Sequence, residues 1–298
     1  MMRRWFRNRK SILSDFVTGV GLFWLVVEIA SYSTDGKTDS LAKSVAFFLI
    51  ASVVIVIIAL AKNRPKTSFT YQLRDKDNIV EVRVGDAFDN AGTLVIPVNN
   101  CFDVCMGGNV MKARSLLSKM IAVYYSDKEA HLANDISKKT DCTRAHDIGT
   151  TIEVEQRNKK FYLLASSKKK TNNRVESTVD DVLLSISKLW EYIALESGRD
   201  AAVTIPLIGT NHGRIHDLTR STIVKEIIHS YIEASKRLSI CDKLIISILP
   251  SDLKKGNIDL DEIDEYLEYS CKHYRKVTLA TKPEGEEVSG SSVAHLDN

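Results

Sequence analysis

Residues 93–103 read TLVIPVNNCFD, and this stretch decides the fold class. Its first six residues form an apolar run without the polar alternation of a half-exposed strand, which is typical of a strand covered on both faces. Polar residues follow at once, beginning with Asn99 and Asn100, so the strand ends there. A strand covered on both faces is expected in an α/β protein, and in such folds ligands bind at the carboxyl ends of the strands.

Similar apolar runs alternate with amphipathic segments through the rest of the body. The runs predict strands at 79–84, 93–98, 150–155, 161–165, 201–206 and 243–249. Helices are expected at 178–197, where Thr178 and Asp181 form a capping box and Gly198 ends the helix, and at 218–238 and 259–273. Two more are expected within 109–139. This order predicts a three-layer α/β/α sandwich with a mixed central sheet.

Charge divides unevenly along the chain. The 298 residues carry a formal net charge of +3, and 44% hydrophobic with 27% charged residues fits a folded protein. Residues 1–66 hold ten Lys or Arg and four Asp or Glu, a net charge of +6, so the remainder carries −3. A body at −3 gives no support for nucleic-acid binding, which usually needs a basic face, so we expect no nucleic-acid partner.

The basic N-terminal part predicts a membrane hairpin. Residues 44–61 are eighteen uncharged residues, nearly enough as a helix to cover a hydrocarbon core of about 30 Å. A second apolar run occupies 16–33, and basic residues flank both outer ends. The positive-inside rule then predicts a two-pass membrane protein with both termini in the cytoplasm. The expected domains are a basic N-terminus at 1–11, a two-span transmembrane hairpin at 12–64, the α/β domain at 68–280 and a flexible tail at 281–298.

Alternatives to a spanning hairpin are less consistent with the pattern. A cleaved signal peptide also starts with basic residues and an apolar run, but here a second apolar run follows almost at once. A surface-lying amphipathic pair would show a charged stripe, which 44–61 lacks. Glu28 is the one acid within a span. It either lies near the interface, or it faces other helices in an assembly and lines a polar path.

Three strand ends carry the candidate chemistry. Asp86, within VGDAF at 84–88, offers a carboxylate that can accept from an exocyclic amine such as adenine N6. Asn99 and Asn100 offer amides suited to ribose hydroxyls, and the loop PLIGTNHGR at 206–214 offers backbone N–H groups to a diphosphate. Each motif alone also fits a helix cap, an Asn-rich turn or a tight strand–helix connection.

Other chemistries lack their motifs. The chain has neither the G-K-[ST] of a P-loop nor G-x-G-x-x-G, so NTP hydrolysis and NAD-dependent dehydrogenation are not expected. Its five cysteines and seven histidines show no metal-ligand spacing, so we expect no metal and no cofactor. Cys101 and Cys105 lie close to the candidate site in sequence, where one of them could touch a ligand.

The order of the three motifs resembles the macro domain, a binder of ADP-ribose. The closer similarity is to the divergent macro domain of Thoeris anti-phage defence effectors, through IPVNNCFD, DIGTT followed by FYLLA, and IPLIGTNHGR. It covers about residues 79–278, and the two-span N-terminus is similar to the membrane-anchored form of that effector. The resemblance implies that residues 68–280 form a macro domain and that the ligand is an ADP-ribose derivative. It also implies that the membrane is the inner membrane of a bacterium.

The resemblance also implies roles for residues. Asp86 would hold the adenine amine with help from the Phe88 backbone, Asn99 and Asn100 would lie near the distal ribose, and the loop at 209–214 would hold the diphosphate. The late loop has Asn211 and His212 where the family has an aromatic residue, which leaves room for a modified ADP-ribose. The expected ligand-binding residues are Asp86, Ala87, Phe88, Pro97, Asn99, Asn100, Phe102, Gly107, Gly108, Leu207, Ile208, Gly209, Thr210, Asn211, His212, Gly213 and Arg214.

The implied function is that of a sensor and effector rather than an enzyme. A TIR-domain partner makes a diffusible signal, histidine-ADP-ribose, and its binding to the macro domain drives a homo-oligomer that disrupts the lipid bilayer and causes abortive infection. The rival function is a membrane-anchored ADP-ribosyl hydrolase or deacetylase, in which Asn99 or Asp103 positions a water. A structural membrane scaffold without a ligand is the third alternative.

Overall fold

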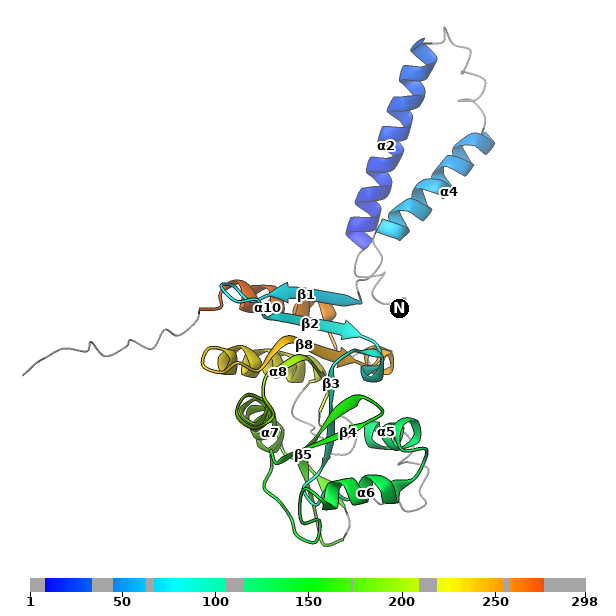
Figure 1. Ribbon diagram of the computed structural model, residues 1–298. Helices are drawn as coiled ribbons and strands as arrows, with labels where there is room; N and C mark the ends of the chain where they lie inside the picture. The colour runs from blue at the N-terminus through cyan, green and yellow to red at the C-terminus, as the bar shows by residue number, and fades with distance from the viewer. Residues whose placement is uncertain are drawn as a thin grey trace, which may run out of the picture.

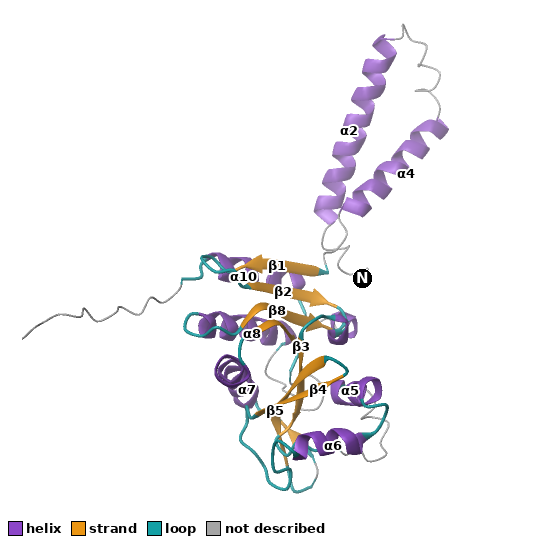
Figure 2. Cartoon of the chain, viewed as in Figure 1, coloured by secondary structure: helices purple, strands orange, loops and turns teal. Residues whose placement is uncertain are grey.

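The structure combines an N-terminal pair of helices with an α/β domain (Figures 1 and 2). It is a computed structural model that describes residues 9–33, 45–62, 67–104, 115–172, 174–208, 219–254 and 258–275. The expected tail at 281–298 lies outside these residues.

An eight-stranded mixed sheet forms the middle layer of the domain. Across the sheet the strands are β1 (Ser68–Gln72), β2 (Ile79–Val84), β8 (Cys241–Ile248), β7 (Asp200–Pro206), β3 (Thr93–Asn99), β5 (Lys159–Lys169) and β4 (Thr151–Gln156), and β6 (Val175–Glu176) pairs with the end of β5. The strands β2, β8, β7, β3 and β5 are parallel, whereas β1, β4 and β6 run antiparallel to their neighbours. The carboxyl ends of the five parallel strands therefore share one edge.

Helices cover both faces of this sheet (Figure 1). On one side lie α5 (Leu116–Tyr124) and α6 (Glu129–Ser137), and on the other lie α7 (Val179–Tyr192), α8 (Arg220–Ser235) and α10 (Leu260–Lys272). Successive residues of β3 alternate between the two cores, with Leu94 in one and Val95 in the other, and both are fully buried. This explains the uninterrupted apolar run and confirms the predicted three-layer α/β/α architecture.

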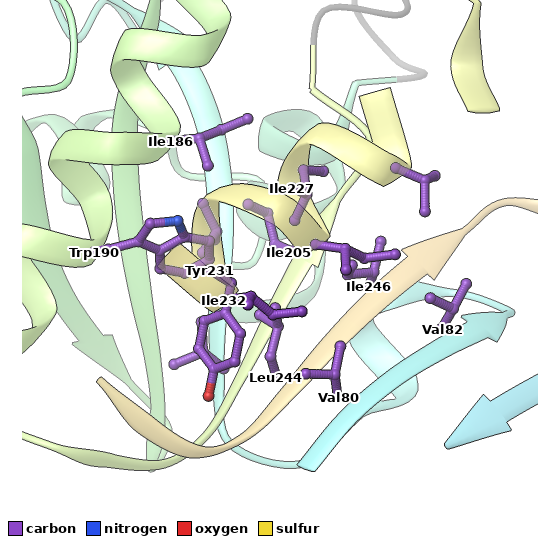
Figure 3. Close-up of a cluster of buried hydrophobic side chains, with 14 of the residues drawn as sticks. Val80, Val82, Ile186, Trp190, Ile205, Ile227, Tyr231, Ile232, Leu244 and Ile246 are labelled. Atoms are coloured by element: carbon purple, nitrogen blue, oxygen red, sulfur yellow. The ribbon is translucent and has the colours of Figure 1, made fainter. Parts of the chain in front are cut away.

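The larger core lies between the sheet and the pair α7 and α8. Figure 3 shows Trp190 and Tyr231 from these helices against Ile205, Leu244 and Val80 of the strands. The Trp190 and Tyr231 rings meet edge to face, with centroids 5.5 Å apart. Each fully buried aliphatic side chain contributes about 1.5–3 kcal/mol to stability, so this layer holds α8 firmly against the strands.

Most expected elements are present, and the differences have simple physical causes. The capping box of Thr178 and Asp181 starts α7, which continues as a π-helical turn, Ile193–Ser197, before Gly198. The helices expected within 109–139 are α5 and α6. The strands β1 and β6 and the short helix α9 (Pro250–Lys254) were not expected, because they are too short or too polar to form an apolar run. The strand β5 extends to Lys169, beyond the predicted end at 165, because its last residues are polar and form no apolar run.

The two N-terminal helices are α2 (Arg9–Ser33) and α4 (Val45–Lys62). The spans Ile12–Ser33 and Val45–Lys62 have mean hydropathies of 1.8 and 2.8 and are long and apolar enough to cross a membrane. Gly19 packs tightly on Ile55, because a Cβ there would lie 2.6 Å from Cγ2 of Ile55. The ammonium of Lys62 lies 2.7 Å from the carboxylate of Asp15, which joins the start of α2 to the end of α4.

Gly92 and Gly198 provide a matched test of backbone packing. Their φ angles are +82° and +81°, but a Cβ at Gly92 would overlap the Ala202 carbonyl of β7, whereas nothing lies within 4 Å of one at Gly198. We expect Gly198→Ala to lower the free energy of unfolding by about 1–3 kcal/mol through strain alone, because φ of 81° with ψ of 165° is a conformation that essentially only glycine adopts. Gly92→Ala should cost at least about 2 kcal/mol more, because β7 must shift. Urea unfolding of the full-length protein in detergent measures both, and equal losses would contradict the packing account.

Candidate ligand-binding site

The shared carboxyl edge of the parallel strands brings the expected site residues together. Asp86 follows β2, Asn99 ends β3, and Leu207 follows β7. The ends of β2 and β8 are tied to each other, because the Gly85 N–H donates to the Ile248 carbonyl at 3.0 Å. Gly107, Gly108 and the loop residues Gly209, Thr210, Asn211, His212, Gly213 and Arg214 lie outside the described residues, so their roles stay predictions.

Asp86 is held between two donors. Its Oδ1 accepts from the backbone N–H of Phe88 at 3.1 Å, which caps the 3-10 helix η1 (Ala87–Asp89). Its Oδ2 accepts from the ammonium of Lys119, which comes from α5. Burial alone would raise the pKa of Asp86, but the hydrogen bonds from Lys119 and Phe88 lower it below its ordinary value. Asp86 is therefore a fixed, ionised acceptor.

An aromatic group supports this carboxylate. The Lys119 ammonium lies 4.9 Å from the centroid of the Phe88 ring, a distance that favours a cation–π interaction. Phe88 stacks on Tyr124 with centroids 6.2 Å apart, and Tyr124 packs edge to face on Phe161 of β5. Ala87 is buried as well, so the short segment after β2 is held in place by the packing of both Ala87 and Phe88.

Asn99 organises the turn after β3. Its side-chain oxygen accepts from the backbone N–H groups of Cys101 and Asp103, at 3.0 and 3.2 Å. The strand register shifts between Val98 and Asn99, so the turn begins at an irregularity in the β3–β5 pairing. Phe102 adopts a left-handed φ of 51° and is buried. Pro97, also expected at the site, is half-buried within β3.

Asn100 holds three segments together. Its side-chain oxygen accepts from the Lys169 N–H at 2.9 Å, and its amide nitrogen donates to the His146 carbonyl at 3.3 Å. Its own backbone bonds to Ser167 and His146. The Asn100 side chain is thus engaged in fixing the end of β5 and the segment around His146 to the end of β3. Its predicted proximity to the distal ribose stays a prediction.

Several residues of this edge were not foreseen from the sequence. Lys119 reaches Asp86, Lys169 lies 2.7 Å from Asp103, and Arg220 at the start of α8 pairs with Asp252 of α9 at 3.3 Å. The two residues of each ion pair lie far apart in the sequence, and no sequence motif connects them. Lys119 is the only charged residue of α5, and this is the one signal that the sequence offers for it.

Two further features of the domain are a lack of metal-binding clusters among the described residues and a hollow away from Asp86. Among the described residues, no group of three or more His, Cys, Asp or Glu side chains could hold a metal ion. A shallow hollow between α8 and α10, lined by His229, Glu233 and His273 among others, lies near the starts of β2 and β8. This hollow is at the opposite edge of the sheet from Asp86.

The chain is similar to known proteins both in sequence and in structure. The chain matches the family model described as "Thoeris protein ThsA, Macro domain" over residues 80–249. A macrodomain mutant (N30A) from Oceanobacillus iheyensis is 13% identical with a TM-score of 0.45, over 69% of this chain and 96% of that one. The same macrodomain with ADP is 12% identical with a TM-score of 0.43, over 67% and 99%.

A comparison with curated proteins finds no match. The family match runs from β2 through the end of β8 and includes Asp86, Asn99 and the connection after β7. Because it spans more than half of the chain, the protein belongs to the family of Thoeris ThsA macro domains.

Proposed function

We propose that this protein is an anti-phage defence effector whose macro domain binds an ADP-ribose-derived signal, histidine-ADP-ribose, made by a TIR-domain partner. One observation carries the proposal. The shared edge of five parallel strands gathers Asp86, Asn99 and the end of β7 in a Thoeris-family domain that follows two long apolar helices. Ligands of open α/β sheets bind at such an edge.

Each part of the site has a chemical role in this proposal. The ionised Asp86 accepts a hydrogen bond from the adenine amine, and the turn organised by Asn99 lies beside the distal ribose. Backbone N–H groups of residues 107–108 and 209–214 hold the diphosphate. Such donors bind an anion without a basic surface, which suits a domain whose residues after 66 carry a net charge of −3.

The two apolar helices supply the effector step. We expect them to span the inner membrane with both termini in the cytoplasm, so that the Asp15–Lys62 ion pair lies at the cytoplasmic end of both helices. Two spans are too few for a pore in one chain, so the step requires a homo-oligomer. Signal binding that favours the assembled state would cluster the hairpins, disrupt the membrane and cause abortive infection.

The geometry favours binding over hydrolysis. Asn99 uses its side-chain oxygen for two backbone N–H groups, and the Asp103 carboxylate pairs with Lys169. Macro domains include both binders and hydrolases, so an ADP-ribosyl hydrolase or deacetylase is the alternative. Release of free ADP-ribose from modified protein by the wild type, lost in Asn99→Ala, would support that alternative.

Ligand binding is tested by calorimetry on the full-length protein in detergent. We expect micromolar or tighter binding of histidine-ADP-ribose, and weaker binding of ADP-ribose. Asp86→Ala should lower affinity about 10–100-fold, because a charge-assisted hydrogen bond is lost. Asp242→Ala is the matched control, since Asp242 forms an exposed ion pair with Arg199 at the opposite edge. Failure of the wild type to bind either compound at micromolar concentration would contradict the proposal.

The effector step is tested by dye release from vesicles that contain the full-length protein. Histidine-ADP-ribose should trigger release with the wild type and not with Asp86→Ala, whose helices are unchanged. If Glu28 lines a polar path in the assembly, Glu28→Leu should reduce release, because the path loses its charge. Unchanged release in Glu28→Leu would place this exposed side chain at the interface instead.

A further inference from the structure

We propose that a second copy of this chain packs on the side of α2 that faces away from α4, with the α2 helices of the two copies in contact. The inference rests on the proposed function, in which α2 and α4 span a membrane and several chains assemble. It names the helix, and the side of that helix, through which the copies meet, and it leaves α4 in contact with lipid.

One side of α2 is already used by the hairpin itself. Gly19 lies so close to Ile55 that a Cβ there would be 2.6 Å from its Cγ2. Further along the helix, the centroid of the Phe23 ring lies 5.6 and 6.2 Å from those of Phe47 and Phe48. Gly19 and Phe23 therefore mark the side of α2 that α4 covers. Because consecutive residues of an α-helix are about 100° apart, the residue midway between them points the opposite way.

The side of α2 opposite α4 carries small and polar residues at regular intervals. Positions 14, 18, 21, 25, 28 and 32 are spaced alternately four and three residues apart, which places them on one line along the helix. We call this line the outer seam, and its residues, all exposed, are Ser14, Thr18, Gly21, Leu25, Glu28 and Tyr32. Four of the six carry a hydroxyl or a carboxyl group. Spacing of this kind is the pattern through which two helices pack along their length.

The outward side of α4, over the described residues 45–62, carries no comparable line. Every exposed residue of α4 from Val45 to Ala61 is aliphatic, and the mean hydropathies of the two spans, 2.8 for α4 and 1.8 for α2, show the same contrast. Lipid chains offer no hydrogen-bond partner, so they suit an aliphatic surface, whereas polar residues within spans almost always face other helices or a water-filled cavity. The outward side of α4 therefore faces lipid, and the outer seam of α2 faces protein.

Gly21 gives the second helix room to approach. A Cβ at this position would meet nothing within 4 Å, so packing within the chain does not require a glycine there. Glycine in a membrane-spanning helix allows two backbones to come close together, and hydroxyl groups such as those of Ser14 and Thr18 can hydrogen-bond between helices.

The occupant that fits the outer seam is the same seam of a second copy. Chains in one membrane have the same orientation, so two α2 helices pair in parallel and each seam residue lies near its own counterpart. Glu28 then faces another carboxyl group rather than lipid, and a pair of carboxyl groups that shares a proton can form a hydrogen bond.

The test is disulfide cross-linking of the full-length protein in lipid vesicles, with copper phenanthroline as the oxidant and with and without histidine-ADP-ribose. Ser14→Cys and Leu25→Cys should each give a covalent dimer, because the seam brings their Cα atoms near the separation of about 4.4–6.8 Å that a disulfide requires. The matched control is Val53→Cys on the outward side of α4, which should give at least about fivefold less dimer because lipid separates its copies. The wild type reports any cross-link from its own cysteines.

A second pair of variants changes the size of a side chain on each helix. Gly21→Leu should reduce the Leu25→Cys dimer at least about tenfold, because the added side chain holds the two helices apart. Ala46→Leu makes a similar change on the outward side of α4 and should leave the dimer unchanged. Both variants keep the hairpin, since Gly21 has open space around it and Ala46 is exposed.

Equal cross-linking at positions 25 and 53, or a dimer that survives Gly21→Leu, would overturn the inference. Cysteines at 14 and 25 that react with a membrane-impermeant maleimide but form no dimer would assign the outer seam to a water-filled path, which also overturns the packing of α2 on α2. The proposed function is judged separately. Cross-linking at the seam that does not increase with histidine-ADP-ribose would support the contact between copies and contradict the signalling step.

Discussion

Burial of the parallel strands on both faces is the constraint on which the structure depends. A strand covered by helices on both sides is mainly apolar, and β3 carries its polar side chains, Thr93 and Asn99, only at its two ends. Parallel pairing then brings the carboxyl ends of β2, β3 and β7 to one edge. Burial of parallel strands on both faces therefore stabilises the domain and also brings the candidate binding residues to one edge of the sheet.

The same edge is where the N-terminal helices connect. Because β1 runs antiparallel to β2, its first residue, Ser68, pairs with Arg83 near the carboxyl end of β2. The Val84 N–H donates to the Thr67 carbonyl at 2.7 Å, and Thr67 is five residues after Lys62, where α4 ends. Asp86 is two residues beyond Val84. In the proposed function, ligand binding thus acts within a few residues of the chain that leads to the membrane.

The sequence predicts the elements that depend on local patterns. The strands β2, β3 and β8, the capping box of α7 and the order of motifs at strand ends follow from apolar runs and short spacings. Local patterns do not predict which residues far apart in the sequence come into contact. The pairing of Lys119 with Asp86 and the bonds from Asn100 to His146 and Lys169 depend on how helices and strands pack. Adjacent asparagines with the same chemistry therefore differ in role.

That difference follows from the turn itself. Asn99 sits at the register shift, so its side chain turns back on the N–H groups of Cys101 and Asp103. Asn100, 8% exposed, points into the packed region and satisfies the Lys169 N–H and the His146 carbonyl. A buried amide whose partners are backbone groups cannot be replaced without leaving them unpaired. The double asparagine is thus needed for the shape of the turn after β3, whichever of its atoms a ligand contacts.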